Sequence, residues 1–115
     1  MKREVELEVA LRDSILVYLS IKYEYYSKAL KQENSAILRF IRFDRELIEL
    51  KLYGISESDI YDDFSGLCIS HVKVLKRNDD LYISLDPYDE RVDVIESKDN
   101  FVFKVKSYKL DIRQV

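Results

Sequence analysis

The sequence contains very little glycine, proline and cysteine, and no tryptophan. Among its 115 residues there are two Gly, one Pro and one Cys. So few chain-breaking residues indicate long regular elements joined by short turns, rather than the many shaped loops that carry active sites. Gly54 and Gly66 do not lie in a phosphate-binding pattern. The sequence therefore predicts no nucleotide-dependent chemistry, and we expect no cofactor and no enzymatic activity.

Long apolar runs and cysteine pairs are missing as well. The longest uninterrupted apolar run, Ile15–Leu19, is far shorter than the roughly 20 residues that cross a bilayer. Cys68 is alone and cannot form an internal disulfide, and residues 1–13 carry charges where a signal peptide has an apolar centre. We therefore expect a cytoplasmic protein that makes no membrane contact.

The residues that are present are those of a folded domain. Hydrophobic residues make up 47% of the chain and charged residues 36%, which is enough apolar surface to offset the entropy of the chain. The length is that of one typical domain, so we treat residues 1–115 as a single unit. Its pattern changes in the middle, from a helical half (1–64) to a β half (67–113).

Helical spacing dominates our interpretation of the first half. Residues 4–33 lack Gly and Pro and carry apolar residues three, four and seven apart, which predicts a long first helix. The alternation of Val, Leu and Val with Glu over residues 4–9 leaves a short edge strand as the alternative there. A second helix follows Asn34 or Ser35 and ends at Gly54, so that the two form a helical hairpin.

A short third helix is predicted at residues 56–64, because Ser56 followed by Asp59 resembles a capping box. Four β-branched or aromatic runs, separated by turn residues, then predict an antiparallel meander of four strands. These runs are 67–76, 81–85, 91–96 and 101–112.

Alternation within residues 81–86 predicts a sheet that is covered on one face only. Leu81, Ile83 and Leu85 share one face, and we expect the helical hairpin to pack on it. In the last run the apolar parity switches near Lys106 or Ser107, which predicts a bulge or a sharp bend. The expected fold is therefore α+β, with a helical hairpin and a short third helix on a four-stranded meander, and a strongly bent, SH3-like form of that meander remains open.

Charge is distributed unevenly along the chain. Residues 1–53 contain ten basic and nine acidic side chains, residues 54–100 contain five and twelve, and residues 101–115 contain four and one. The middle segment therefore carries a charge of −7 in a chain whose net charge is −3. Aspartate is also a good turn and cap residue, so acidic turns do not by themselves require a partner.

The first functional hypothesis is a non-enzymatic protein-binding module of the small acidic inhibitor or immunity type. It presents an acidic, tyrosine-bearing face to a partner with a basic surface, because a face of one charge sign steers an oppositely charged partner. The residues predicted to form this face are Asp59, Asp62, Asp63, Asp86, Tyr88, Asp89 and Glu90. No motif relates the chain to a known family of immunity proteins or phage inhibitors.

Tyrosines in the first predicted helix suggest a second contact surface. Tyr23, Tyr25 and Tyr26 cannot all face one core, because neighbours on a helix point about 100° apart. Exposed tyrosines commonly anchor interfaces. The alternatives are a helix that is buried on two sides within the domain and a homodimer through the long N-terminal helix.

Arginines recur every third residue in the second predicted helix and lead to an alternative function. Arg39, Arg42 and Arg45 form a basic ridge there, interleaved with phenylalanines, which could contact phosphates in a nucleic-acid-associated accessory protein. Neighbouring acidic residues and the negative net charge favour a self-paired, solvated face instead.

Candidate catalytic residues are few. Cys68 and His71 have a Cys-x-x-His spacing, but residues three apart on a strand point to opposite faces, so we expect a core cysteine and a surface histidine. The Asp86–Glu90 turn lacks the spacing of a calcium-binding loop, and we predict no metal site. A small hydrolase remains the third hypothesis, and it requires His71 to meet a carboxylate of this turn.

Overall fold

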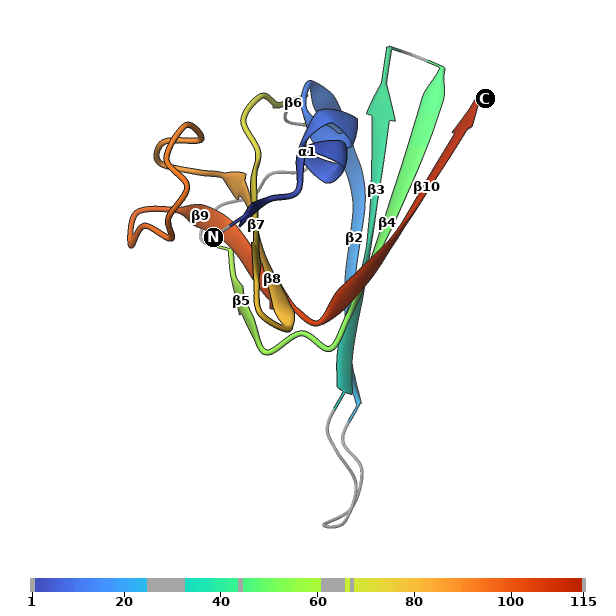
Figure 1. Ribbon diagram of the computed structural model, residues 1–115. Coiled ribbons are helices and arrows are strands. Elements are labelled where there is room, and N and C mark those ends of the chain that lie inside the picture. The colour runs from blue at the N-terminus through green and yellow to red at the C-terminus, as the bar shows by residue number, and fades with distance from the viewer. Residues whose placement is uncertain (1, 25–32, 44, 61–65, 67, 115) are drawn as a thin grey trace.

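The computed structural model describes residues 2–24, 33–43, 45–60, 66 and 68–114, and this part of the chain is almost entirely β-structure (Figure 1). Its elements in chain order are β1 (Lys2–Arg3), α1 (Val5–Leu11), β2 (Ser14–Glu24), β3 (Glu33–Arg42), β4 (Glu46–Tyr53), β5 (Glu57–Asp59), β6 (Cys68–Ile69), β7 (Lys73–Arg77), β8 (Asp80–Asp86), β9 (Asn100–Val105) and β10 (Ser107–Gln114).

The strands form two antiparallel sheets of five strands each. Sheet A has the order β1-β7-β8-β9-β5, and sheet B has the order β10-β4-β3-β2-β6. Their inner faces pack on each other, and the buried side chains between them form one main hydrophobic core. Along β3 the inner residues are Ala36, Leu38 and Phe40, which alternate with more exposed neighbours as a strand with one buried face requires.

The two sheets meet at a corner where the chain crosses twice. Gly54 leads from β4 toward β5 with a φ of +66°, a conformation that glycine adopts without strain. Lys106 lies at the bend between β9 and β10. A Cβ atom at position 54 would lie only 3.0 Å from side-chain atoms of this lysine. The backbone N–H of Lys106 donates to the carbonyl of Tyr53, so the two crossings are hydrogen-bonded (Figure 1).

The helix α1 lies at the other end of the core (Figure 1). Leu7, Ala10 and Leu11 bury its apolar face. Glu8, also buried, accepts a hydrogen bond from the backbone N–H of Val74 in β7 at 2.8 Å and pairs with Arg3 at 2.6 Å. A buried carboxylate therefore ties the helix to the edge of sheet A, and its charge is compensated by the guanidinium.

The structure contradicts the predicted helical half. Residues 5–11 are helical, as one of the two interpretations of that segment expected, but the helix ends at Leu11, and residues 14–24 and 33–42 are strands that pair along their length. The described residues contain no helical hairpin, and residues 57–59 of the predicted third helix form β5, while residues 61–65 lie outside the described chain. Homodimerisation through a long N-terminal helix is therefore wrong as well, and no helix in the described residues is long and apolar enough to span a bilayer.

The β half is correct in part. Strand β8 spans the predicted run 81–85, and the bend predicted near Lys106 is confirmed. Residues 91–96, however, are not a strand, and the predicted four-stranded meander is wrong because β9 and β10 belong to different sheets. What covers the inner face of β8 is mainly a second sheet, which provides the apolar layer that the helical hairpin was expected to provide.

Phe40 and its neighbour Ile41 test the assignment of inner and outer faces. Phe40 is fully buried, so Phe40→Ala should lower the free energy of unfolding by about 3–5 kcal/mol through lost burial and the cavity that remains. Ile41 points outward and is 37% exposed, so Ile41→Ala should lower it by less than about 1 kcal/mol. Chemical denaturation of both variants measures the difference, and equal losses would contradict the assignment.

Candidate interaction surface

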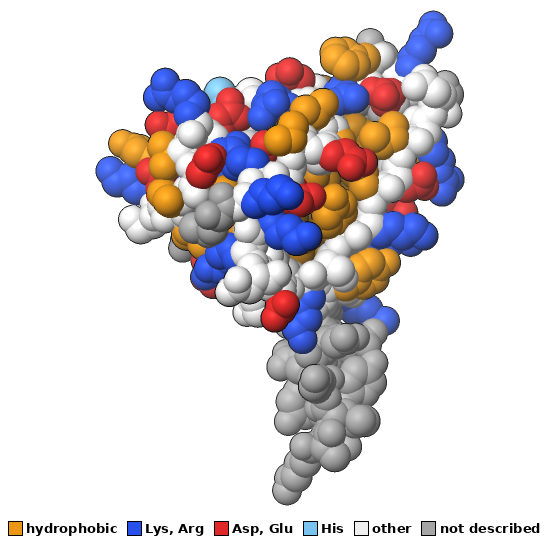
Figure 2. Space-filling model, viewed as in Figure 1, with side chains coloured by type: hydrophobic (Ala, Val, Ile, Leu, Met, Phe, Trp, Pro, Cys, Tyr) orange, Lys and Arg blue, Asp and Glu red, His pale blue; other side chains and the backbone are white. Residues whose placement is uncertain are grey.

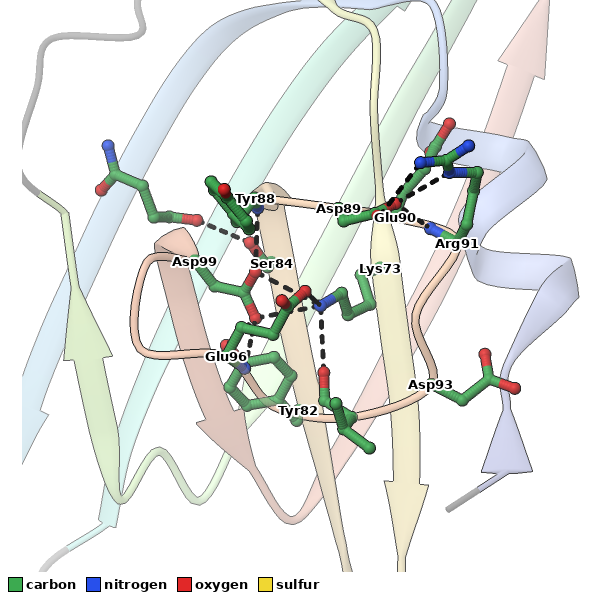
Figure 3. Close-up of polar contacts among 12 residues, drawn as sticks. Lys73, Tyr82, Ser84, Tyr88, Asp89, Glu90, Arg91, Asp93, Glu96 and Asp99 are labelled. Atoms are coloured by element: carbon green, nitrogen blue, oxygen red, sulfur yellow. Dashed lines mark hydrogen bonds and ion pairs between the residues drawn. The ribbon is translucent and has the colours of Figure 1, made fainter.

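A segment without regular structure covers the outer face of sheet A. Residues 87–99, which we call the covering segment, connect β8 to β9 and pass over β7 and β8 (Figure 3). Ile95 of this segment packs against a small apolar cluster formed by Leu75, Tyr82 and Val102. The outer face of sheet A is therefore buried, although the sequence predicted that this side of the sheet was open.

The covering segment is fixed by a fully buried lysine. Lys73 lies on the outer face of β7 with no exposed side-chain surface, and its Nζ atom donates to the carbonyl of Val94 at 3.0 Å. The same ammonium pairs with Glu96 at 3.0 Å and with Asp99 at 3.2 Å (Figure 3). A buried ammonium is tolerated only when it is paired and hydrogen-bonded, and three acceptors of the covering segment meet that need.

Asp99 is the centre of this network. Its carboxylate accepts hydrogen bonds from the Tyr82 hydroxyl at 2.7 Å and from the backbone N–H groups of Tyr88 and Glu96, in addition to Lys73. Burial alone would raise the pKa of Asp99, but these donors stabilise the carboxylate and hold its pKa below the ordinary value. Burial and the adjacent carboxylate raise the pKa of the Tyr82 hydroxyl.

Glu90 anchors the middle of the covering segment to the residues just before β7 and just after α1. It accepts from the backbone N–H of Val72 at 3.1 Å, pairs with Arg12 at 3.4 Å and lies 3.0 Å from Nδ1 of His71. Partial burial opposes ionisation, yet these partners lower the pKa of Glu90. The structure thus brings His71 to a carboxylate of the Asp86–Glu90 turn, as the hydrolase hypothesis required.

That pair supplies an orienting carboxylate and an exposed imidazole, but not a nucleophile. Cys68 is exposed in β6, and no hydrogen bond joins it to His71 among the described residues. Cys68 is therefore not the core residue that we expected. The described residues also contain no group of three or more potential metal ligands.

The residues predicted to form an acidic face are only partly brought together. Asp89 and Glu90 lie in the covering segment, where Asp89 pairs with Arg91 at 3.0 Å. Asp86 and Tyr88 are exposed, with Lys98 over the Tyr88 ring. Asp59 lies in β5, beside Glu57, and their hydrogen bond raises the pKa of Asp59.

Asp62 and Asp63 lie outside the described residues. On the face that Figure 2 shows, basic and acidic side chains are intermixed rather than gathered into an area of one sign. Much of the acidic excess of residues 54–100 is therefore paired within the chain, with Lys73, Arg12 and Arg91 among the partners.

The three arginines do not form a ridge, because residues 33–42 form a strand instead of a helix. Arg39 lies on the outer face of sheet B and pairs with Glu49 at 2.9 Å. Arg42 lies three residues further along β3 and therefore belongs to the other face, where it pairs with Glu46 and donates to the carbonyl of Val9. Arg45 is exposed beside the turn that leads into β4.

The outer face of sheet B has no covering segment among the described residues. On β2 and β3 it carries a contiguous patch of Ile15, Val17, Tyr18, Arg39 and Ile41, which we call the β2–β3 patch. Ile15 is the cross-strand neighbour of Ile41, and Tyr18 is the neighbour of Arg39. The four apolar or aromatic members are each between 37% and 48% exposed. A register shift between Leu16 and Tyr18 leaves Val17 outside the ladder and turned to solvent.

Arg39 stacks on Tyr18 at the centre of this patch. Its guanidinium carbon lies 4.5 Å from the centre of the Tyr18 ring, and Glu49 holds it from the other side. The paired contacts fix two long side chains in place before any partner arrives. The patch was not predicted from the sequence, because residues 4–33 and the segment that follows were assigned to helices, and apolar residues on both faces of β3 leave no clear period of two there.

The Lys73–Asp99 pair can be tested by removing one or both charges. Lys73→Met should lower the free energy of unfolding by about 3–5 kcal/mol, because it leaves the buried Asp99 carboxylate without its cation. The double variant Lys73→Met/Asp99→Asn removes both charges and should recover part of that loss. Denaturant titrations of both variants provide the comparison, and a double variant no more stable than Lys73→Met would count against the pair.

Acid should weaken the fold through Asp99. Because the folded-state pKa is lowered, the carboxylate contributes stability that is present above the unfolded value of about 3.9 and is lost as the pH falls through the folded value. The free energy of unfolding of the wild type should therefore decrease more steeply below about pH 4 than that of the Lys73→Met/Asp99→Asn variant. Parallel pH series of denaturation curves measure both slopes, and identical slopes would show that Asp99 does not contribute.

Within the described part of the chain, the β2–β3 patch thus gathers exposed apolar side chains of two neighbouring strands on an uncovered sheet face, and it is a candidate protein-binding surface. Its geometry combines a flat strand pair, a fixed Tyr–Arg stack and a bulged valine. Comparison with known proteins found no matching family model, no matching curated protein and no matching solved structure.

Proposed function

We propose that this protein is a non-enzymatic protein-binding module that contacts its partner through the β2–β3 patch. The observation that supports this function is the Arg39–Tyr18 stack among exposed aliphatic side chains on an uncovered sheet face. Tyr and Arg are the residue types most often found at the energetic centre of protein interfaces. Each offers a large contact area at a low entropy cost once it is held in place.

The surroundings of the patch resemble the anatomy of an interface. The apolar centre on β2 and β3 is bordered by charged side chains on β4 and β10, which include Lys51, Lys109 and Arg113 as cations and Glu49 and Asp111 as anions. A polar rim around an apolar centre excludes water from the contacts that contribute most to affinity. The small excess of cations favours a partner with acidic groups around its own apolar contact area.

A second candidate surface for the same function is the exposed part of the predicted acidic face. Asp86 and Tyr88 are the members of that face with open side chains, and the Tyr88 ring is 62% exposed. This surface is smaller than the β2–β3 patch, and the neighbouring carboxylates Asp89 and Glu90 already have partners within the chain. It therefore serves as the comparison in the test of the proposal.

The test compares matched variants of the two surfaces. Val17 and Val94 are both 48% exposed, on the β2–β3 patch and on the covering segment respectively. A partner is first captured with the wild type from cells that naturally contain the protein, and its affinity is then measured with purified components. Val17→Asp and Tyr18→Ala should each weaken binding by about 30-fold, the effect of losing about 2 kcal/mol at an interface centre, whereas Val94→Asp should not.

The opposite pattern identifies the other surface. Loss of binding in Asp86→Lys and Tyr88→Ala, with unchanged binding in Val17→Asp and Tyr18→Ala, would overturn the assignment to the β2–β3 patch in favour of the acidic face. Unchanged binding in all four variants would overturn both. Because the altered side chains are exposed, equal unfolding free energies of the variants and the wild type confirm that the comparison reports on binding.

A further inference from the structure

Strand β10 forms an open edge of sheet B. Its eight residues, Ser107–Gln114, pair on one side with β4 over their whole length, and no other strand among the described residues pairs with them (Figure 1). The other side therefore presents backbone N–H and C=O groups that a further strand can bind.

Strand β10 lacks several of the usual protections of an edge strand, although its outer face carries the charged side chains Lys109, Asp111 and Arg113. Natural edges are kept short, carry charged side chains, or contain proline, a bulge or a charge that points inward. Strand β10 has no Pro and no Gly, its pairing with β4 is regular, and its inner face carries Tyr108, Leu110 and Ile112. Ile112 is 43% exposed on this side. The strand is thus long, regular and apolar on the face that would pack in an extended sheet.

The charges on the outer face of β10 do not match those of its neighbour. Lys109 lies directly opposite Lys51 of β4, and Asp111 lies directly opposite Glu49. Like charges in directly opposite positions destabilise a strand pair. Asp111 pairs with Arg113 of its own strand at 2.9 Å, and Glu49 pairs with Arg39 and Lys51. The directly opposite positions of β10 and β4 therefore carry no complementary charges, and the compensation between the two strands comes from diagonal neighbours such as Arg113 and Glu49.

We propose that a second copy of this chain binds to the open edge, with the two β10 strands antiparallel and Leu110 opposite the Leu110 of the other copy. In this register Lys109 of each copy lies opposite Asp111 of the other, which gives two symmetric ion pairs. On the inner face Leu110 contacts its equivalent and Tyr108 lies opposite Ile112, so the exposed isoleucine is covered. The contact is the same on both copies, as a two-fold dimer requires.

The charge order selects this register. Moving one copy by two residues, to place Asp111 opposite its equivalent, would keep a similar overlap but set Asp111 against Asp111 and Lys109 against Arg113. Moving it the other way, so that Lys109 lies opposite its equivalent, would pair two lysines and shorten the overlap. A shift by a single residue would exchange the inner and outer faces. The favoured pairing joins the two copies of sheet B into one continuous sheet of ten strands, and it does not involve α1.

Charge reversal provides the test, because it should separate the dimer from the monomer fold. In the monomer, Lys109→Asp places an acid opposite Lys51, and Asp111→Lys places a base opposite Glu49, so neither change should harm the fold. Each change sets like charges against each other twice in the dimer. Each single variant should therefore raise the dimer dissociation constant at least about tenfold in sedimentation equilibrium at low salt.

Mixing the two single variants should restore dimer formation. An equimolar mixture of the two single variants restores both ion pairs and should form a heterodimer, and the double variant Lys109→Asp/Asp111→Lys should dimerise by itself. Lys98→Asp and Asp86→Lys, which change exposed charges on the covering segment and at the end of β8, serve as controls of equal charge and should dimerise like the wild type. A wild type that remains monomeric at the highest soluble concentration, a dimer unaffected by the single reversals, or a mixture that does not associate would each overturn the proposal.

Discussion

The burial of the Lys73 ammonium is the interaction on which the arrangement of this protein depends most. Sheet A has strands that are apolar on both faces, so its outer face needs a cover, and the irregular segment between β8 and β9 places Ile95 on that face among mostly polar residues. Lys73 and Asp99 hold the covering segment on this face, because their charged groups form hydrogen bonds with its backbone from beneath. The backbone of Tyr88 and of Glu96 is thereby held without a strand ladder.

The same solution accounts for much of the acidic middle of the chain. Asp99 neutralises Lys73, Glu90 meets Arg12 and His71, and Asp89 meets Arg91, so these carboxylates hold the covering segment and its neighbours in place. The sequence suggested that these carboxylates form an exposed acidic surface, but in the fold many of them pair with basic side chains of the same chain. This is why the candidate surface moves from the acidic segment to the β2–β3 patch, where apolar and aromatic side chains remain exposed.

The unequal covering of the two sheets also locates the surfaces that remain open. Sheet A is enclosed by sheet B on one side and by the covering segment on the other. Sheet B has an uncovered outer face in the described chain, and its edge strand β10 pairs on one side only. The proposed partner site and the proposed dimer edge therefore belong to the same sheet, and they share the charged residues Lys109 and Asp111 of β10. A dimer through β10 would place two β2–β3 patches on one continuous sheet.

Part of this structure could be predicted from local sequence. The strand at residues 81–85, the turn residues that precede it and the bend at Lys106 follow from alternation and from a switch of parity, which are properties of a few neighbouring residues. The two faces of β3 could not be distinguished in this way, since the inner residues Ala36, Leu38 and Phe40 alternate with Ile37, Arg39 and Ile41, two of which are also apolar. We weighted the pairs that fit a spacing of three and four, and short apolar runs satisfy both periods.

The sequence alone determined a single chain segment rich in apolar residues, with an unpaired cysteine, few chain-breaking residues and an acidic middle. The tertiary structure decided which of two compatible periods the first half adopts, because strand pairing between residues far apart stabilises β2, β3 and β4 more than local helix propensity can. It also decided which charges are paired and which faces are covered. Those outcomes depend on contacts such as Lys73 with Asp99, whose partners are 26 residues apart in the chain and are brought together by the pairing of β7, β8 and β9.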